Sequence, residues 1–287
     1  MISVVVPAYN EAAAIGTDLD AIVQTLEAAG HEFEIIVVDD GSTDATAQIA
    51  AARPGVRLIR HPNNQGAGAS IATGIRQAKG DTIVITDADG TYPNKDIPVL
   101  VARLDQADMV VGARRQETGW LPWLRRPAKA FIRMLASYLS GVPIVDLNSG
   151  LRCFRREVVE PFLPILPRGH SWVGTMTLVM LAHGYRVAYL PIDYYPRQGK
   201  SSFHPVADTY SYLLLVVRTI MYFDPLRVLL PVSLGLLALG GLKLIRDVIV
   251  FQGHVPGSTL MIILSGIQVG VLALMADLVV KRTSFRG

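Results

Sequence analysis

The stretch Ile83-Val84-Ile85-Thr86-Asp87-Ala88-Asp89 is a run of β-branched residues that ends in two carboxylates. Such a run is typical of a short buried strand. Because side chains alternate along extended backbone, Asp87 and Asp89 are expected on the same side of the chain. Paired carboxylates at a strand end suit a hard divalent cation such as Mg²⁺ or Mn²⁺, which keeps positions open for phosphate oxygens. Taken alone, the residues from Asp87 to Gly90 are equally compatible with a plain polar turn.

Strand and helix patterns alternate around this stretch. Strands are expected at residues 2–6, 34–38, 56–60, 82–86 and 109–111, with helices at about 12–29, after Ser42-Thr43-Asp44, and at about 67–79 and 96–104. This alternation predicts an α/β fold, in which a mostly parallel, Rossmann-like sheet carries helices on both faces. Ligands bind such sheets beyond the carboxyl ends of the strands. Three polar runs follow predicted strands and should therefore converge on one crevice: Pro7-Ala8-Tyr9-Asn10-Glu11, Asp39-Asp40-Gly41-Ser42 and Asp87-Ala88-Asp89.

Two apolar blocks lie near the C-terminus, at residues 228–245 and 258–280. They raise the hydrophobic content to 51% and the mean hydropathy to +0.36. Each is close to the length of about 20 residues that a membrane helix needs, so we expect a transmembrane hairpin joined by a loop at residues 246–257. The alternative is a pair of buried core helices.

Charges near the apolar blocks predict the orientation. Basic residues flank the outer ends of the hairpin: Arg218, Arg227, Lys281, Arg282 and Arg286. The positive-inside rule then places the N-terminal domain in the cytoplasm of a multi-pass cell-membrane protein, although Lys243 and Arg246 argue the other way. The single cysteine, Cys153, excludes an internal disulfide, as expected in that compartment. A net charge of +3 fits phosphorylated ligands or an anionic lipid surface better than a nucleic acid.

Two further segments have the composition of membrane-surface helices. Between residues 113 and 140, arginines and lysines alternate with large apolar side chains such as Trp120 and Trp123, which is typical of an amphipathic segment at a membrane interface. An ordinary solvated helix is the alternative interpretation. Residues 211–227, directly before the first apolar block, are expected to form a juxtamembrane interface helix.

Several motifs, in order along residues 1–210, resemble those of a known family. They are Val5-Val6-Pro7-Ala8-Tyr9-Asn10-Glu11, Val38-Asp39-Asp40-Gly41-Ser42-Thr43-Asp44, Asn64-Gln65-Gly66-Ala67-Gly68, Asp87-Ala88-Asp89-Gly90, Val111-Gly112-Ala113-Arg114, Asp146-Leu147-Asn148-Ser149-Gly150-Leu151-Arg152 and Arg197-Gln198-Gly199-Lys200-Ser201-Ser202. The chain resembles the family 2 glycosyltransferases of the GT-A fold, close to the polyprenyl-phosphate sugar transferases typified by dolichol-phosphate mannose synthase. The C-terminal hairpin resembles that of bacterial members with membrane helices.

This resemblance implies an activity and roles for individual residues. The expected activity is transfer of a single sugar, with inversion, from a UDP- or GDP-linked hexose to undecaprenyl or dolichyl phosphate. Asp87 and Asp89 would bind Mg²⁺ or Mn²⁺ and, with Arg197 and Lys200, carry the catalysis. The nucleotide-binding set would be Pro7, Ala8, Tyr9, Glu11, Asp39, Asp40 and Ala88, and the acceptor-phosphate set would be Arg114, Arg125, Arg126 and Ser201. Assembly into a homo-oligomer is a further property that the resemblance suggests.

The chain departs from the family pattern at two places. Thr91 stands where relatives often have a Gln that could be a third metal ligand, and Gly66-Ala67-Gly68 replaces the common Gly-Lys-Gly. A lipid phosphate acceptor is already anionic and needs no strong base, whereas a hydroxyl acceptor would need one, for which Asp146 is the motif-based candidate. Two alternatives stay open: a processive polysaccharide or glycolipid synthase, which the lack of an Arg-Trp pair argues against, and an inactive nucleotide-sugar-binding scaffold, which the two intact metal-site aspartates argue against.

Overall fold

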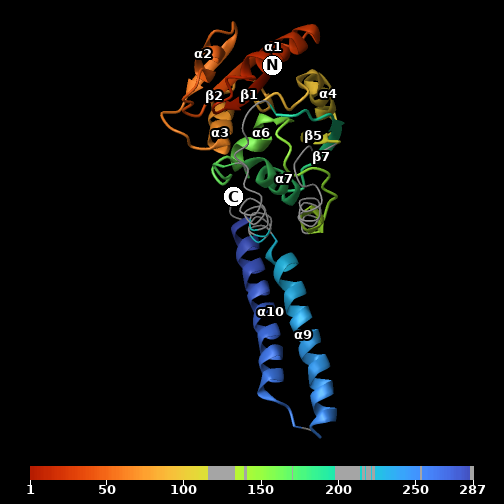
Figure 1. Cartoon of the computed structure of the whole chain (residues 1–287). Coiled ribbons are helices and arrows are strands. Elements are labelled where there is room, and N and C mark those ends of the chain that lie inside the picture. Colours follow the sequence, from red (N-terminus) through yellow and green to blue (C-terminus); the bar gives the residue numbers. More distant parts are fainter. Residues whose placement is uncertain are drawn as a thin grey trace. The chain divides into compact units, whose positions relative to one another are not determined.

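The structure is a computed structural model that describes residues 1–115, 133–138, 141–169, 171–197, 214, 217, 221, 224–252 and 254–284. Two compact units are present (Figure 1). The larger draws on residues 1–138 and 142–213, and the smaller on residues 139–141 and 214–287. The predicted interface segment at 113–140 and the juxtamembrane segment at 211–227 lie largely outside the described residues.

A seven-stranded sheet organises the larger unit, with the strand order β3-β2-β1-β4-β6-β5-β7. The strands are β1 (Ile2–Ala8), β2 (Phe33–Asp39), β3 (Val56–Arg60), β4 (Thr82–Ile85), β5 (Met109–Arg114), β6 (Arg152–Arg155) and β7 (Val187–Ile192). Strands β1 to β4 pair in parallel, as does β5 with β7, while β6 runs antiparallel to both of its neighbours. The predicted mostly parallel α/β sheet is confirmed.

Helices cover both faces of this sheet (Figure 1). They are α1 (Ile15–Ala28), α2 (Thr46–Ala51), α3 (Ala67–Gln77), α4 (Ile97–Ala102), α6 (Arg156–Val159) and α7 (Trp172–Ala182), with short 3₁₀ turns at Asn94–Asp96, Arg103–Asp105 and Glu160–Phe162. On one face, α1 and α4 pack on alternate strand residues such as Val4 and Val6. On the other face α3 approaches so closely that a Cβ on Gly74 would lie 2.3 Å from Val5 Cγ1. This alternation follows from the period-2 geometry of strands.

The smaller unit contains two long apolar helices, α9 (Pro225–Val250) and α10 (Gly257–Ser284), which pack together as a hairpin. Both are long and apolar enough to cross a membrane, and only 11% and 17% of their most hydrophobic windows are buried. A core helix of a soluble protein would be mostly buried, so the low burial of these two windows disfavours the core-helix alternative. Small residues allow the close approach: Ser233 Oγ donates to Gly266 O at 2.7 Å, and Gly240 faces Ile263.

The turn of the hairpin is shorter than the sequence predicted. We expected the loop to begin at Arg246, but α9 continues to Val250. The charges in its last turns are compensated locally: Lys243 Nζ lies 2.7 Å from Asp247 Oδ2, and it also donates to Thr259 Oγ1 at 2.7 Å. Because the carboxylate of Asp247 is paired and almost fully buried, the helix does not need to end before it.

Candidate active site

Three parallel strand ends bring the predicted polar runs together. In the sheet register Ala8 pairs with Asp39 across β1 and β2, and Val5 pairs with Ile85 across β1 and β4. The residues that follow these strands therefore leave the same edge of the sheet side by side. Ala8 and Ala88 are buried, whereas the Tyr9 side chain is 44% exposed at the rim. The convergence expected from the sequence is present, while the nucleotide-binding role of these residues stays a prediction.

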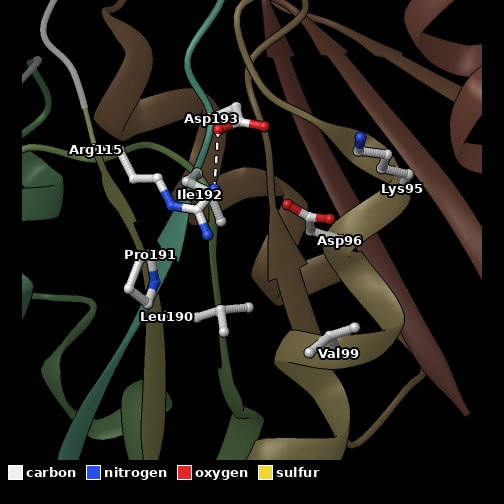
Figure 2. Close-up of a pocket in the computed structure, with 8 residues that line it drawn as sticks. All are labelled: Lys95, Asp96, Val99, Arg115, Leu190, Pro191, Ile192 and Asp193. Carbon is white, nitrogen blue, oxygen red and sulfur yellow. Dashed lines mark hydrogen bonds and ion pairs between the residues drawn. The ribbon is translucent and has the colours of Figure 1, made fainter.

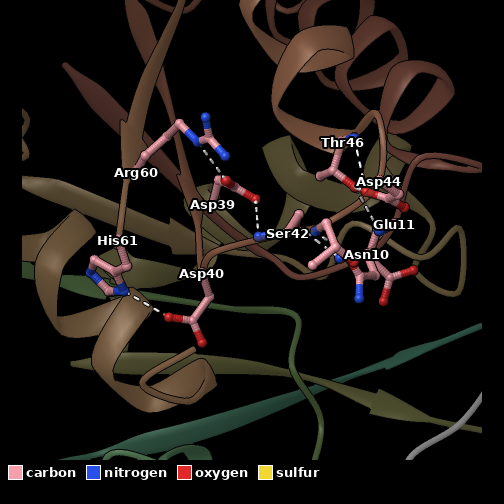
Figure 3. Close-up of polar contacts among 10 residues, drawn as sticks. Asn10, Glu11, Asp39, Asp40, Ser42, Asp44, Thr46, Arg60 and His61 are labelled. Atoms are coloured by element: carbon pink, nitrogen blue, oxygen red, sulfur yellow. Dashed lines mark hydrogen bonds and ion pairs between the residues drawn. The ribbon is translucent and has the colours of Figure 1, made fainter. Parts of the chain in front are cut away.

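The two carboxylates at the end of β2, on Asp39 and Asp40, both have hydrogen-bond donors within the protein (Figure 3). Asp39 accepts hydrogen bonds from Ser42 N at 3.2 Å and from Arg60 Nε at 2.9 Å. Asp40 accepts from the backbone N–H groups of Gln65 at 2.9 Å and Gly66 at 2.8 Å, and His61 Nδ1 lies 2.7 Å from Asp40 Oδ1. Burial alone raises the pKa of Asp40, but these donors outweigh burial and lower that pKa below its ordinary value.

The turn after β1 is fixed by side chains of the β2–α2 loop (Figure 3). Asn10 adopts a left-handed backbone conformation with φ 57°, which Asn tolerates better than most residues. Its N–H donates to Ser42 Oγ at 2.9 Å, and its own Oδ1 accepts from Thr43 N at 2.8 Å. Glu11 N donates to Thr46 Oγ1 at 2.8 Å. These contacts hold the Tyr9-Asn10-Glu11 turn against the neighbouring strand end and set where the Glu11 side chain emerges.

The carboxylates after β4 are in a different environment, because an arginine that is distant in the sequence, Arg197, lies beside Asp89. Arg197 hydrogen-bonds through Nη2 to Glu11 Oε1, and its Nε lies 3.4 Å from Asp89 Oδ2. The other oxygen of Asp89 accepts from Thr91 N at 3.1 Å and from Thr91 Oγ1 at 2.6 Å. Thr91 is thus an orienting residue for Asp89, since its hydroxyl proton points at the carboxylate.

Burial and crowding raise pKa values in this acidic group. Burial, and after it the charge of Asp89, raise the pKa of Asp87 to about 7. Burial also raises the pKa of Glu11 to about 7, although Arg197 opposes the shift. Asp87 is seated against backbone: a Cβ on Gly150 would lie 2.6 Å from Asp87 Oδ2, and Gly150 N donates to Tyr92 Oη at 2.6 Å. Carboxylates crowded at this one place favour a bound cation.

The donor set at Asp87 and Asp89 fits Mg²⁺ or Mn²⁺. Among the described residues, no group of three or more His, Cys, Asp or Glu side chains could hold a metal by itself. Magnesium is commonly held by one or two carboxylates together with water and substrate phosphates, rather than by a complete protein cage. Asp87 and Asp89, with the Glu11 carboxylate nearby, meet that description. The Arg197 guanidinium, beside Asp89, provides further positive charge at this place.

Arg114, predicted to meet the acceptor phosphate, is bonded to Asp146. Arg114 Nε and Nη2 donate to the two Asp146 oxygens at 2.8 Å and 2.9 Å, and the guanidinium lies 5.2 Å from the centre of the Tyr194 ring. Burial raises the pKa of Asp146, but Arg114 outweighs it and the net shift is downward. A carboxylate so stabilised in its ionised form is a poor general base, which disfavours a hydroxyl acceptor. The acceptor role of Arg114 stays a prediction, and Arg125, Arg126, Lys200 and Ser201 lie outside the described residues.

Sequence reasoning assigned no role to two supporting residues, Asp18 and Arg152. Asp18 Oδ2 accepts from Gly90 N at 2.8 Å and so fixes the turn after Asp89; burial raises its pKa to about 6. A signal was available, because Asp18 falls on the buried stripe of α1 with Ile15 and Leu19. Arg152 is fully buried and donates to Ser149 O at 3.1 Å and to Val173 O at 2.7 Å.

Two cavities lie apart from these carboxylates. One of about 190 Å³ is lined by residues of the α4 start and of β7, with Arg115 paired to Asp193 at 3.2 Å (Figure 2). The other, of about 180 Å³, lies between α3 and residues 163–168. None of the predicted site residues lines either cavity.

The sheet, its acidic strand ends and the hairpin define a GT-A-type α/β domain joined to two apolar helices. The family model named glycosyl transferase family 2 matches residues 3–162, and the model named GtrB C-terminal hairpin matches residues 224–281. The first match covers more than half of the chain. The chain belongs to glycosyl transferase family 2, as the sequence motifs predicted.

Curated relatives include undecaprenyl-phosphate 4-deoxy-4-formamido-L-arabinose transferases. The protein of that name from Pseudomonas savastanoi pv. phaseolicola is 32% identical over 257 residues, which cover 83% of this chain and 71% of the relative. The one from Edwardsiella ictaluri is 32% identical over 210 residues, covering 70% of this chain and 62% of the relative. The matched part thus falls to less than two thirds of the length of some of these relatives.

Solved structures share the fold at low sequence identity. Glucosyl-3-phosphoglycerate synthase from Mycobacterium tuberculosis, in complex with Mn²⁺, UDP and phosphoglyceric acid, superposes with a TM-score of 0.61 at 23% identity, covering 77% of each chain. Mannosyl-3-phosphoglycerate synthase from Rubrobacter xylanophilus gives a TM-score of 0.59 at 22% identity, covering 77% of this chain and 72% of that one. These similarities establish the GT-A-type fold.

Proposed function

We propose that this protein transfers one sugar from a nucleotide sugar to a polyprenyl phosphate at the membrane. The observation that carries the proposal is the placement of Asp87, Asp89, Glu11 and Arg197 at the common edge of β1 and β4, in a chain that also carries an apolar hairpin. The names of the curated relatives support an undecaprenyl-phosphate acceptor and a sugar donor. UDP-linked and GDP-linked hexoses are the donor classes to test.

Asp87 and Asp89 would hold Mg²⁺ or Mn²⁺ against the donor diphosphate. When bound, the cation supplies Lewis-acid stabilisation of the charge that develops on the leaving nucleoside diphosphate. The glucosyl-3-phosphoglycerate synthase from Mycobacterium tuberculosis, which shares the fold, was solved in complex with Mn²⁺ and UDP, and this supports the choice of ion class. Thr91 directs the second oxygen of Asp89 toward this place by occupying the first.

Arg197 and Lys200 would provide fixed positive charge at the diphosphate. A guanidinium binds two phosphate oxygens at once, and each such donor contributes about 3 kcal/mol in comparable oxyanion sites. The acceptor phosphate is ionised near neutral pH, so it needs to be oriented and partly neutralised but needs no general base. The residues proposed to orient and neutralise it are Arg114, Arg125, Arg126 and Ser201. Attack opposite the leaving group inverts the anomeric centre.

The hairpin would cross the membrane twice, with the catalytic domain in the cytoplasm. Supporting this, α9 and α10 are of spanning length with exposed apolar faces. Basic residues at the outer ends of the hairpin give the orientation. This arrangement brings the reacting phosphate of a long lipid and a water-soluble donor to the same surface.

One assay tests the proposal directly. Membranes that contain the protein are incubated with radiolabelled UDP- and GDP-sugars, and the lipid fraction is extracted. We expect label from one donor class in a lipid that releases its sugar in mild acid. EDTA should remove this activity, and Mg²⁺ or Mn²⁺ should restore it.

Other outcomes separate the alternatives. Label that enters polymer and no lipid would support a processive synthase. Donor binding without label transfer to any fraction would support an inactive scaffold. Full lipid labelling in the presence of chelator would contradict the metal assignment. Membranes that lack the protein provide the background.

A further inference from the structure

The contacts of Arg197 point to a second property of the donor site. We propose that the Arg197 guanidinium occupies the place of the divalent cation when no donor is bound, so that cation and guanidinium compete for Asp89. The donor diphosphate would relieve this competition by taking over Arg197. The cation would then bind tightly only together with the diphosphate. This inference rests on the metal site of the proposed function.

The hydrogen bonds of Asp89 leave one of its two oxygens able to bind a metal ion. Its Oδ1 accepts from both the N–H and the hydroxyl of Thr91, at 3.1 Å and 2.6 Å. Its Oδ2 faces Arg197 Nε at 3.4 Å. The oxygen with remaining capacity for a cation is thus the one beside the guanidinium. A cation at that oxygen would lie within a few ångströms of a fixed positive charge, which is strongly unfavourable near a protein surface.

Charge balance accounts for the position of the Arg197 side chain between Glu11 and Asp89. Glu11 and Asp89 are nearly buried, and Asp87 is half-buried beside them. Arg197 reaches both Glu11 and Asp89. The nearby Arg114 gives its two-pronged contact to Asp146. A diphosphate offers the Arg197 guanidinium two phosphate oxygens to bind at once. These contacts compensate Arg197 for leaving Glu11 and Asp89.

The exchange needs only a side-chain movement. Tyr195 N donates to Thr91 O at 2.9 Å, so the backbone two residues before Arg197 is attached to the same turn that carries Asp89. The Arg197 side chain itself is 35% exposed. Long side chains change rotamer rapidly at such exposure. The guanidinium therefore can leave Glu11 and Asp89 for a diphosphate while its backbone stays in place.

The test measures metal binding and not turnover. The full chain in detergent is titrated with Mn²⁺, alone, with UDP and with GDP, and free Mn²⁺ is measured by electron paramagnetic resonance; the nucleotide that strengthens Mn²⁺ binding, called UDP below, is used for the variants. For the wild type we expect the Mn²⁺ dissociation constant to fall by about 10-fold or more when UDP is added, within the usual range of coupling between sites. For Arg197→Ala we expect Mn²⁺ alone to bind about 5-fold tighter or more, and the UDP enhancement to shrink.

Two variants serve as controls. Arg115→Ala removes an arginine whose carboxylate partner is Asp193, and it should bind Mn²⁺ like the wild type. Arg197→Lys keeps the positive charge, so Mn²⁺ alone should bind it about as weakly as the wild type. Thermal unfolding of each variant reports whether the fold is retained, and the Lys variant preserves the test if the Ala variant is unstable.

The outcomes distinguish this inference from the function on which it rests. Unchanged or weaker Mn²⁺ affinity in Arg197→Ala, with Mn²⁺ and UDP still binding together, would overturn the competition and leave the metal site intact. The competition would also be overturned if Arg197→Lys, without UDP, bound Mn²⁺ about 5-fold tighter than the wild type. Failure of the wild type to bind Mn²⁺ with either UDP or GDP added would overturn both.

Discussion

Asp40, after β2, and Asp87, after β4, lie at one edge of one sheet, yet their pKa values are shifted in opposite directions. Asp39 and Asp40 are satisfied by backbone N–H groups, His61 and Arg60, and the pKa of Asp40 is lowered. Asp87 is crowded against Asp89 and Glu11, and its pKa is raised to about 7. From this difference we predict that ionised Asp40 stabilises the folded protein, whereas ionised Asp87 is stabilised by a bound cation.

Loss of a carboxylate after β4 should have the largest effect on activity and little effect on stability. We expect Asp87→Asn or Asp89→Asn to lower lipid labelling by about 10³-fold or more, because the site loses several kcal/mol of transition-state charge stabilisation. Because the pKa of Asp87 is raised in the folded protein, the free energy of unfolding falls as the pH rises from the ordinary Asp pKa to about 7. Urea unfolding at pH 8 in EDTA should therefore show Asp87→Asn at least as stable as the wild type. A marked drop in stability would erase the contrast between the two strand ends.

Asp146 extends the comparison to a buried ion pair. Its bidentate contact with Arg114 is mostly shielded from water, with the two side chains 9% and 12% exposed. Removing one partner leaves a buried charge unpaired, so Asp146→Asn should lower the free energy of unfolding by about 3–5 kcal/mol. Urea unfolding followed by tryptophan fluorescence measures this, since all three tryptophans lie in the first 210 residues. Asp193→Asn, which breaks the exposed pair with Arg115, is the control and should cost less than about 1 kcal/mol.

Asp40→Asn should have a smaller but definite effect on stability. An Asn keeps one acceptor oxygen but places an NH₂ group opposite the N–H of Gln65 or Gly66. One donor is then left without an acceptor, at a cost of about 1–3 kcal/mol in the free energy of unfolding. The same urea experiment at pH 7 measures it. Stability equal to that of the wild type would show that the end of β2 does not have the stabilising role described above.

The smallest expected effect is a pH dependence of the difference in unfolding free energy between the wild type and Asp40→Asn. Because the folded pKa of Asp40 is lowered, its contribution is complete above the ordinary Asp pKa of about 3.9 and is lost as the pH falls below that value. The gap in unfolding free energy between wild type and Asp40→Asn should stay constant from pH 8 to 6 and narrow below about pH 4. A gap that is independent of pH would assign the loss to packing and not to charge.

Much of the larger unit could be predicted from local patterns. The β-branched runs located β1 to β5, and the motif order identified the family and the strand ends that carry the acids. Both β6 and β7 were missed: β6 is a four-residue strand that begins and ends with Arg, and β7 contains Pro191 at the sheet edge. The helix α7 is apolar on every side and has no stripe to detect.

The partners of the site residues could not be predicted, because they depend on long-range geometry. Arg114 and Asp146 are 32 residues apart, and Arg197 is 186 residues from Glu11. No spacing rule connects such positions in a mixed sheet. The motifs marked these residues as chemically important, but which carboxylate each arginine contacts follows from the antiparallel β6 and the edge strand β7.

The glycines of the third motif have a consequence for exchanging parts between related enzymes. A Cβ on Gly68 would lie 2.4 Å from Pro167 O, and one on Gly66 would lie 2.6 Å from Arg168 O. The segment before α3 and the turn at residues 167–169 therefore pack with no room for a methyl group between them. A loop transplanted from a homologue at either place will fit only if its counterpart is transplanted with it.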